Sequence, residues 1–163
     1  MDLYLIRHAD AVPVGEQNVI ADEERPLTDV GEAQARTLAT GLQRQAVRLD
    51  LVLTSPLLRA RQTAEGMLRQ WTLPTPAMQV CSELAPGVRS KKLARVLRDL
   101  EGQAVALVGH MPDLADHAAW LIGSKKTQLD LAKAGVAHIV IADKPDKRSG
   151  TLVWLVTPEW LEK

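Results

Sequence analysis

Short apolar runs typical of buried strands alternate along this chain with segments that have the periodicity of amphipathic helices. The strand-like runs lie at residues 3–6, 51–53, 78–81, 104–108, 137–141 and 151–156, of which 78–81 has the weakest pattern. Between them, apolar side chains recur every three or four residues in the segments 35–46, 60–68, 93–100 and 114–122. This order predicts a three-layer α/β fold with a mostly parallel central sheet, because strands that alternate with helices form crossover units.

Three local features refine this prediction. Only the turn-rich segment 144–150 separates the last two strand-like runs, which predicts an antiparallel hairpin at one edge of the sheet. The connection from Asp10 to Leu27 has little regular pattern, and loops of this length are usually functional or mobile. After it, Thr28 can cap a helix. The buried face of that helix is predicted to comprise Ala35, Leu38, Ala39, Leu42 and Ala46.

The length of 163 residues predicts one domain that spans 1–163. A chain of this size can bury roughly 70% of the surface that its unfolded form exposes. The sequence contains no internal repeat, low-complexity tract or linker. A compact α/β core is therefore expected, with almost no chain left over for a large lid.

The charge balance excludes several classes of partner. The 20 Lys and Arg residues are matched by 20 Asp and Glu residues, so no global field attracts nucleic acid or an anionic membrane. Aromatic residues make up 3%, too few for base stacking, and no apolar stretch reaches the ~20 residues of a membrane span. Met1 opens no signal-peptide pattern, and the single Cys81 excludes an intramolecular disulfide. We therefore expect a cytoplasmic protein.

Residues that can bind and transfer an anion follow four of the predicted strands. Open α/β sheets bind ligands beyond the carboxyl ends of their strands, so such residues are expected to meet at one rim of the sheet. They are Arg7 and His8 after the first strand, Arg59 after the second, Glu83 after the third and His110 after the fourth.

Phosphoryl transfer is the chemistry that suits this set. Arginine binds phosphoryl oxygens with two parallel hydrogen bonds and keeps its charge, and a neutral imidazole is a competent nucleophile. Cationic neighbours would lower the pKa of such an imidazole and keep it neutral. A metal site at His8 and Asp10 is the alternative, but Arg7 would oppose a divalent cation. We expect no metal and no cofactor.

Four segments together resemble the histidine phosphatase superfamily, also called phosphoglycerate mutase-like. They are Leu5-Ile6-Arg7-His8-Ala9-Asp10, Arg25-Pro26-Leu27-Thr28-Asp29-Val30-Gly31, Thr54-Ser55-Pro56-Leu57-Leu58-Arg59-Ala60-Arg61-Gln62-Thr63-Ala64 and Val108-Gly109-His110-Met111-Pro112. The first resembles the family's Arg-His-Gly signature, with Ala9 in place of glycine, and the third is the most specific match. The segments occur in the family's order, and the resemblance covers essentially the whole chain.

The resemblance implies a role for each matching residue. His8 would be the nucleophile that accepts the phosphoryl group, Arg7 and Arg59 would clamp its oxygens, and His110 would donate a further hydrogen bond. Water would then hydrolyse the phosphohistidine at His8 without a metal. The departure at Ala9 is tolerable unless the backbone there needs a positive φ.

The branch of the family is indicated by the compact length. Only 26 residues separate Glu83 from His110, enough for one helix, and this form most resembles the SixA-type protein phosphohistidine phosphatases. The resemblance implies a phosphorylated histidine-containing signalling domain as substrate. A small phosphate ester is the alternative within the family. A non-catalytic phosphate-binding module is a third reading, which the intact set of arginines and histidines disfavours.

The general acid is the open position in this scheme. Larger family members use a carboxylate to protonate the leaving group, and Glu83 ranks above Asp10 for that role. Glu83 also fits a substrate contact or a helix start. A phosphohistidine substrate needs less protonation, because imidazole leaves more readily than an alkoxide. Arg25 is balanced between a salt bridge within the loop and a contact with substrate.

Overall fold

The predicted strands pair in one mixed sheet of the computed structural model, which describes residues 1–72, 74–100, 104–124 and 127–161. The strands are β1 (Asp2–Arg7), β2 (Leu51–Thr54), β3 (Ala77–Val80), β4 (Ala104–Gly109), β5 (Val136–Ile141) and β6 (Gly150–Val156). In the order β3-β2-β4-β1-β5-β6, the first four run parallel, and β5 pairs antiparallel with both β1 and β6. The predicted hairpin is confirmed. β3 forms the opposite edge and is largely exposed, which explains the weak apolar pattern of 78–81.

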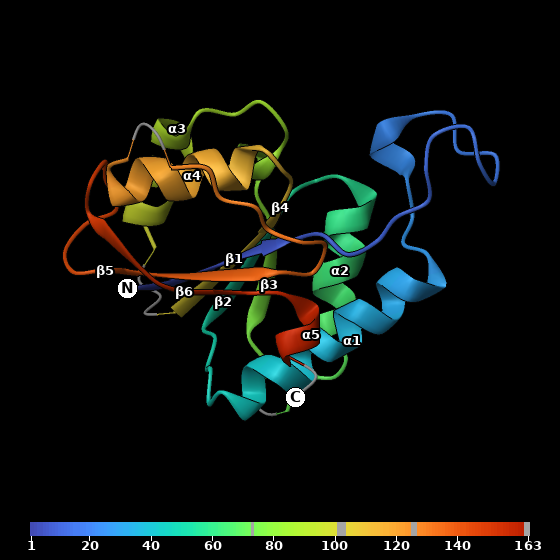
Figure 1. Cartoon of the computed structure of the whole chain (residues 1–163), viewed down its shortest axis with the longest axis horizontal. Coiled ribbons are helices and arrows are strands. Elements are labelled where there is room, and N and C mark those ends of the chain that lie inside the picture. Colours follow the sequence, from blue (N-terminus) through green and yellow to red (C-terminus); the bar gives the residue numbers. More distant parts are fainter. Residues whose placement is uncertain (73, 101–103, 125–126, 162–163) are drawn as a thin grey trace.

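Helices cover both faces of this sheet, as Figure 1 shows. One face packs against α3 (Ser90–Arg98) and α4 (Asp113–Ile122), and the other against α1 (Asp29–Arg44), α2 (Leu58–Leu68) and α5 (Pro158–Leu161). In β1, Leu3 and Leu5 belong to the first core, whereas Tyr4 and Ile6 belong to the second. Because successive side chains of a strand point to opposite faces, a strand covered on both sides is apolar throughout. The three-layer α/β prediction is confirmed.

The start of α1 is fixed by two contacts. Thr28 caps the helix as predicted, since its hydroxyl accepts a hydrogen bond from the backbone N–H of Gly31 at 3.1 Å. Gly31 lies against the chain just after β1, where a Cβ atom would stand 2.0 Å from the carbonyl oxygen of Asp10. The absence of a side chain at Gly31 therefore allows α1 to pack directly beside the end of β1.

The end of α1 corrects one expectation. The helix ends at Arg44, so Ala46 is exposed and does not belong to the buried stripe. Ala46 adopts a left-handed φ of 56°. Its N–H donates to the carbonyl of Gln43, and the N–H of Val47 donates to the carbonyl of Leu42. These two bonds form a Schellman termination. The turn thus ends the helix before the apolar spacing does.

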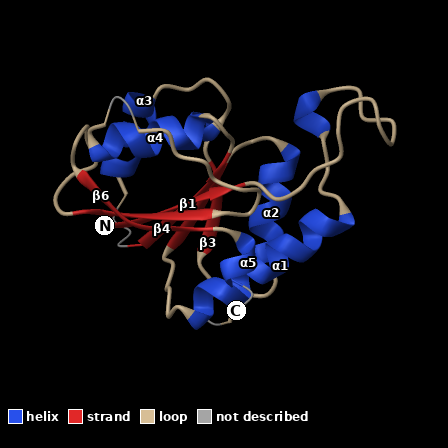
Figure 2. Ribbon diagram, viewed as in Figure 1, coloured by secondary structure: helices blue, strands red, loops and turns tan. Residues whose placement is uncertain are grey.

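The carboxyl ends of the parallel strands share one edge of the sheet. Backbone bonds continue the pairing beyond the strands, from the N–H of His8 to the carbonyl of Gly109 and from that of Ser55 to Val108, both at 2.9 Å. The loop between β1 and α1 begins at this edge and contains a short 3₁₀ turn, η1 (Asp22–Glu24). In Figure 2 it extends outward past the ends of α1 and α2. A bridge between Ala11 and Leu27 joins its two ends.

Candidate active site

His8 lies at the centre of the rim and is held in one orientation. Its side chain is 7% exposed, and Nδ1 lies 2.7 Å from the carbonyl oxygen of Ala9. A carbonyl only accepts hydrogen bonds, so the proton of the neutral ring is on Nδ1 and the lone pair is on Nε2. The Nε of Arg59 donates to that Nε2 at 3.2 Å. The lone pair of His8 Nε2 therefore faces a guanidinium.

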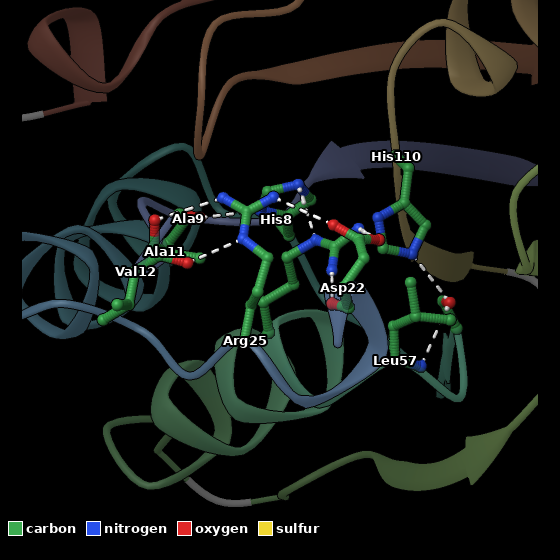
Figure 3. A network of polar contacts seen from close by, with 10 residues as sticks. His8, Ala9, Ala11, Val12, Asp22, Arg25, Leu57 and His110 are labelled. Atoms are coloured by element: carbon green, nitrogen blue, oxygen red, sulfur yellow. Dashed lines mark hydrogen bonds and ion pairs between the residues drawn. The ribbon is translucent and has the colours of Figure 1, made fainter. Parts of the chain in front are cut away.

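Arg59 is the buried cation of the site. It is the second residue of α2 and only 4% exposed. Its other two nitrogens donate to Asp22, NH1 to the backbone carbonyl at 2.6 Å and NH2 to Oδ2 at 2.9 Å. Figure 3 shows the contacts that connect His8 with Asp22 and Asp22 with Arg25. The whole fork of Arg59 is thus directed at the rim rather than at solvent.

His110 faces His8 from the end of β4. The two ring centroids are 5.2 Å apart, and His110 is 3% exposed. Its Nε2 lies 2.8 Å from the Oγ of Ser55, which follows β2. Within the described part of the chain its buried Nδ1 has no hydrogen-bond partner.

Arg7, the neighbour of His8 in the chain, also contributes a cation to the site. Its NH1 donates to the carbonyl of Leu131 at 2.8 Å, which anchors the side chain. Its Nε is buried and has no partner among the described residues. Buried polar atoms without partners are rare in folded proteins. The Nε–H of Arg7 is therefore available to donate to an oxyanion ligand, and Nδ1 of His110 is available in the tautomer that carries its proton there.

Burial and the surrounding cations keep both histidines neutral. Desolvation, opposed by the bond to Ala9 and reinforced by Arg59, Arg7 and Arg25, lowers the pKa of His8 from 6.5 to about 4. Desolvation lowers the pKa of His110 to about 3, with further lowering from Arg59 and His8. At pH 7 the rim therefore holds two neutral imidazoles beside arginine cations.

These shifts predict a loss of stability in acid. The unfolded chain binds protons at both histidines near pH 6.5, whereas the folded chain resists protonation down to about pH 4 and about pH 3. The unfolding free energy is therefore unaffected by these two histidines above about pH 6.5. It decreases progressively as the pH falls toward their pKa values in the folded protein. We expect urea unfolding at pH 7 and pH 5 to show a larger drop in unfolding free energy for the wild type than for the double variant His8→Asn/His110→Asn. An equal drop in both proteins would contradict the assignment.

Arg25 and Asp22 belong to the loop between β1 and α1, which contacts the rim through Arg59. Arg25 donates from Nε to the carbonyl of Val12 at 2.6 Å, from NH2 to that of Ala11 at 3.2 Å, and from NH1 to Oδ1 of Asp22 at 3.1 Å. Arg25 thus makes the loop salt bridge, and it also lies close enough to lower the pKa of His8. Asp22 was not expected from the sequence. The only feature of the sequence that could have indicated Asp22 is that it is an acidic residue three positions before Arg25, a common arrangement in loops.

Among the described residues, neither candidate acid is hydrogen-bonded through its carboxylate to His8, Arg59 or His110. Asp10 forms an ion pair with Lys133 and accepts a hydrogen bond from Thr28 at 2.6 Å. Although burial opposes the change, these bonds lower the pKa of Asp10. Glu83 accepts from Ser82 at 2.9 Å, and this bond is the largest contribution that lowers the pKa of Glu83. The structure thus brings together Arg7, His8, Arg59 and His110, with Arg25 beside them, and places Asp10 and Glu83 in separate networks as carboxylates.

The described residues contain no cluster of three or more His, Cys, Asp or Glu side chains arranged to hold a metal ion. None of the helices in the described part of the chain is long and apolar enough to cross a bilayer.

Comparison with known proteins defines the class. The sequence profile of the histidine phosphatase superfamily (branch 1) matches residues 3–117, which include all four segments that carry the resemblance. The chain belongs to this superfamily. Its phosphoglycerate mutase-like α/β fold agrees with that of the solved relatives.

Individual relatives are similar over nearly the full chain. An uncharacterized protein of Picosynechococcus sp. is 36% identical over 170 residues, 99% of each chain. The phosphohistidine phosphatase SixA of Escherichia coli K12 is 29% identical over 97% of this chain and 94% of its own. A structure of the protein histidine phosphatase SixA complexed with tungstate superposes with a TM-score of 0.82, at 29% identity and 97% coverage of each chain. An Escherichia coli structure assigned as an alpha-ribazole-5'-P phosphatase gives 0.72, at 25% identity, over 97% of this chain and 98% of that one.

Proposed function

We propose that this protein is a metal-independent phosphatase that removes the phosphoryl group from phosphohistidine in a signalling phosphotransfer domain. The observation that carries the proposal is the Nε2 lone pair of a neutral, buried His8 that faces Arg59, beside the unpaired nitrogens of Arg7 and His110. A phosphoryl group brings the oxygens that these donors lack. Positioning and charge stabilisation are the main requirements of its transfer.

The reaction would take two steps at His8. Nε2 attacks phosphorus, so that a new N–P bond forms while the bond from phosphorus to the substrate's imidazole nitrogen breaks. That nitrogen leaves with the electron pair and takes a proton from solvent. Water then attacks the phosphohistidine, inorganic phosphate departs, and the lone pair returns to Nε2. Arg7 and Arg59 balance the negative charge, and His110 donates to an oxygen in both steps.

The protonation states of Asp22 and of the two candidate acids favour this substrate class. The pKa of Asp22, like those of Asp10 and Glu83, is lowered, in this case because hydrogen bonds and charges from Arg25 and Arg59 outweigh burial. These carboxylates are therefore ionised at pH 7, and none of the three holds a proton for a leaving group. An alkoxide leaves poorly without one, whereas imidazole is a better leaving group. The name of the SixA relative supports the same assignment, as does the tungstate, a tetrahedral oxyanion like phosphate, in the matched SixA structure.

A small phosphate monoester is the second candidate substrate. It is favoured by the similarity to the structure assigned as an alpha-ribazole-5'-P phosphatase. That similarity is lower than the one to SixA, in TM-score and in identity. We therefore rank it second.

A substrate panel tests the assignment. We expect kcat/KM for a phosphorylated histidine phosphotransfer domain to exceed that for sugar and nucleoside monophosphates by at least about 100-fold, and EDTA to leave it unchanged. A preference for a small monoester would establish the second candidate instead. Loss of activity in EDTA would contradict the metal-free mechanism, and binding of phosphate without turnover of any substrate would indicate a non-catalytic module.

Asp22 predicts a measurable competition with phosphate. Its carboxylate occupies an arm of Arg59 and is itself about half exposed, so a phosphate must compete with it for that cation. For Asp22→Ala we expect inorganic phosphate to bind about fivefold more tightly at low salt, the scale of one partly exposed ion pair. Isothermal titration calorimetry measures the dissociation constant.

Glu23→Ala is the matched control for Asp22→Ala. It removes one exposed acidic residue from the same 3₁₀ turn without a contact to Arg59. We expect its affinity for phosphate to change little. Weaker phosphate binding in Asp22→Ala than in Glu23→Ala would show that Asp22 supports the anion site instead of competing for it.

A further inference from the structure

Ser55 carries a fully buried hydroxyl that contacts the site through His110. It follows β2, has 0% exposure, and places Oγ 2.8 Å from Nε2 of His110. Its backbone is fixed by the bond from its N–H to the carbonyl of Val108. The hydroxyl and the imidazole therefore meet at the junction of two neighbouring parallel strands.

The direction of this bond follows from the acceptors that are available to the hydroxyl hydrogen. The backbone N–H of Leu57 lies 3.4 Å from Oγ of Ser55 and donates to it. Figure 3 shows Leu57 and His110 at the two ends of this chain of contacts. Within the described residues the imidazole is the one remaining partner for the hydroxyl hydrogen. If Nε2 of His110 were protonated, that hydrogen would be buried without an acceptor, which is unfavourable.

We propose that Ser55 is a positioning residue: its hydroxyl donates to Nε2 of His110 and so holds the proton of that ring on Nδ1, toward the phosphoryl site. The inference rests on the proposed function for the identity of the anion. In the opposite tautomer, Nδ1 would direct a lone pair at the phosphoryl oxygens and repel them. A neutral imidazole has one N–H, so only the tautomer decides whether His110 attracts or repels an oxyanion.

The tautomer can be measured without substrate. Long-range ¹H–¹⁵N NMR of the full-length wild-type protein at pH 7 distinguishes Nδ1–H from Nε2–H in each histidine. We expect His110 in the Nδ1–H form, and a shift toward Nε2–H in Ser55→Ala. A wild-type His110 in the Nε2–H form would overturn the proposal whatever the enzyme's substrate is.

Anion binding and variants provide the second arm. Tungstate serves as the probe, and we expect about tenfold weaker binding in Ser55→Ala, with recovery in Ser55→Thr, which restores a hydroxyl. Ser82→Ala, which removes an exposed serine just past β3, should bind like the wild type. Unchanged tungstate binding in a folded Ser55→Ala protein would overturn the proposal. So would an equal loss of tungstate affinity in Ser55→Thr, if His110 of that variant keeps the Nδ1–H tautomer. Normal tautomer and tungstate results together with no turnover of any phosphorylated substrate would contradict the proposed function alone.

Discussion

Replacing His8 by asparagine should abolish turnover. The expected loss in kcat is at least about 10⁴-fold, since removal of a covalent nucleophile has effects of that size or larger in other enzymes. Asparagine retains an N–H that can donate to the carbonyl of Ala9, so the local hydrogen bond survives while the lone pair that faces Arg59 is lost. Steady-state kinetics with a phosphorylated phosphotransfer domain or a small phosphoramidate measure the change.

His117→Asn is a matched control for the loss of a buried histidine. His117 is as buried as His8, but it bonds to Ser90 and has no contact with the rim. We expect its kcat to stay within about twofold of wild type, even if the unfolding free energy falls. A His8→Asn protein that keeps more than a tenth of the wild-type kcat would rule out His8 as the nucleophile.

Replacing Arg59 by alanine should lower kcat/KM by about 10²–10³-fold, the effect of removing one donor to a developing oxyanion. The change also removes a cation from His8 and His110, so the pKa of each should rise toward its ordinary value. The acid limb of the profile of kcat/KM against pH should therefore move to higher pH. Arg59→Lys, which keeps the charge and loses the planar fork, should retain an intermediate rate and most of the pKa effect.

Arg61→Ala separates this effect from a general loss of positive charge. Arg61 lies two residues further along α2 and is exposed. We expect it to leave both the rate and the acid limb unchanged. If Arg61→Ala and Arg59→Ala had equal effects, the contacts of Arg59 with the rim would not be the cause.

The architecture was predictable because its signals are local. Strands covered on both faces must be apolar throughout, and helices that cover a sheet must carry one apolar stripe, so both appear as patterns in the sequence. The same logic placed His8, Arg59 and His110 at one rim, because parallel strands end at one edge. Ala46 shows the limit of this reasoning: the apolar spacing continued past a left-handed turn that ends the helix.

The loop residues were not predictable in the same way. The position of Asp22 depends on the path of an irregular loop that is joined by Ala11 and Leu27 and crosses to α2. The contact of Ser55 depends on register, because a one-residue shift would take its hydroxyl away from His110. Such positions follow from tertiary geometry, and no periodicity in the sequence marks them.

A covalent phosphohistidine at His8 is the most direct test of the proposed mechanism. The wild-type protein is mixed with a phosphorylated phosphotransfer domain, quenched within milliseconds in alkaline denaturant, and analysed by peptide mass spectrometry and ³¹P NMR. Because Nδ1 of His8 is bonded to Ala9, we predict a base-stable, acid-labile phosphoryl group on Nε2 of His8. Release of inorganic phosphate with no phosphoryl group on His8 at any quench time, or with one on another residue, would contradict this account.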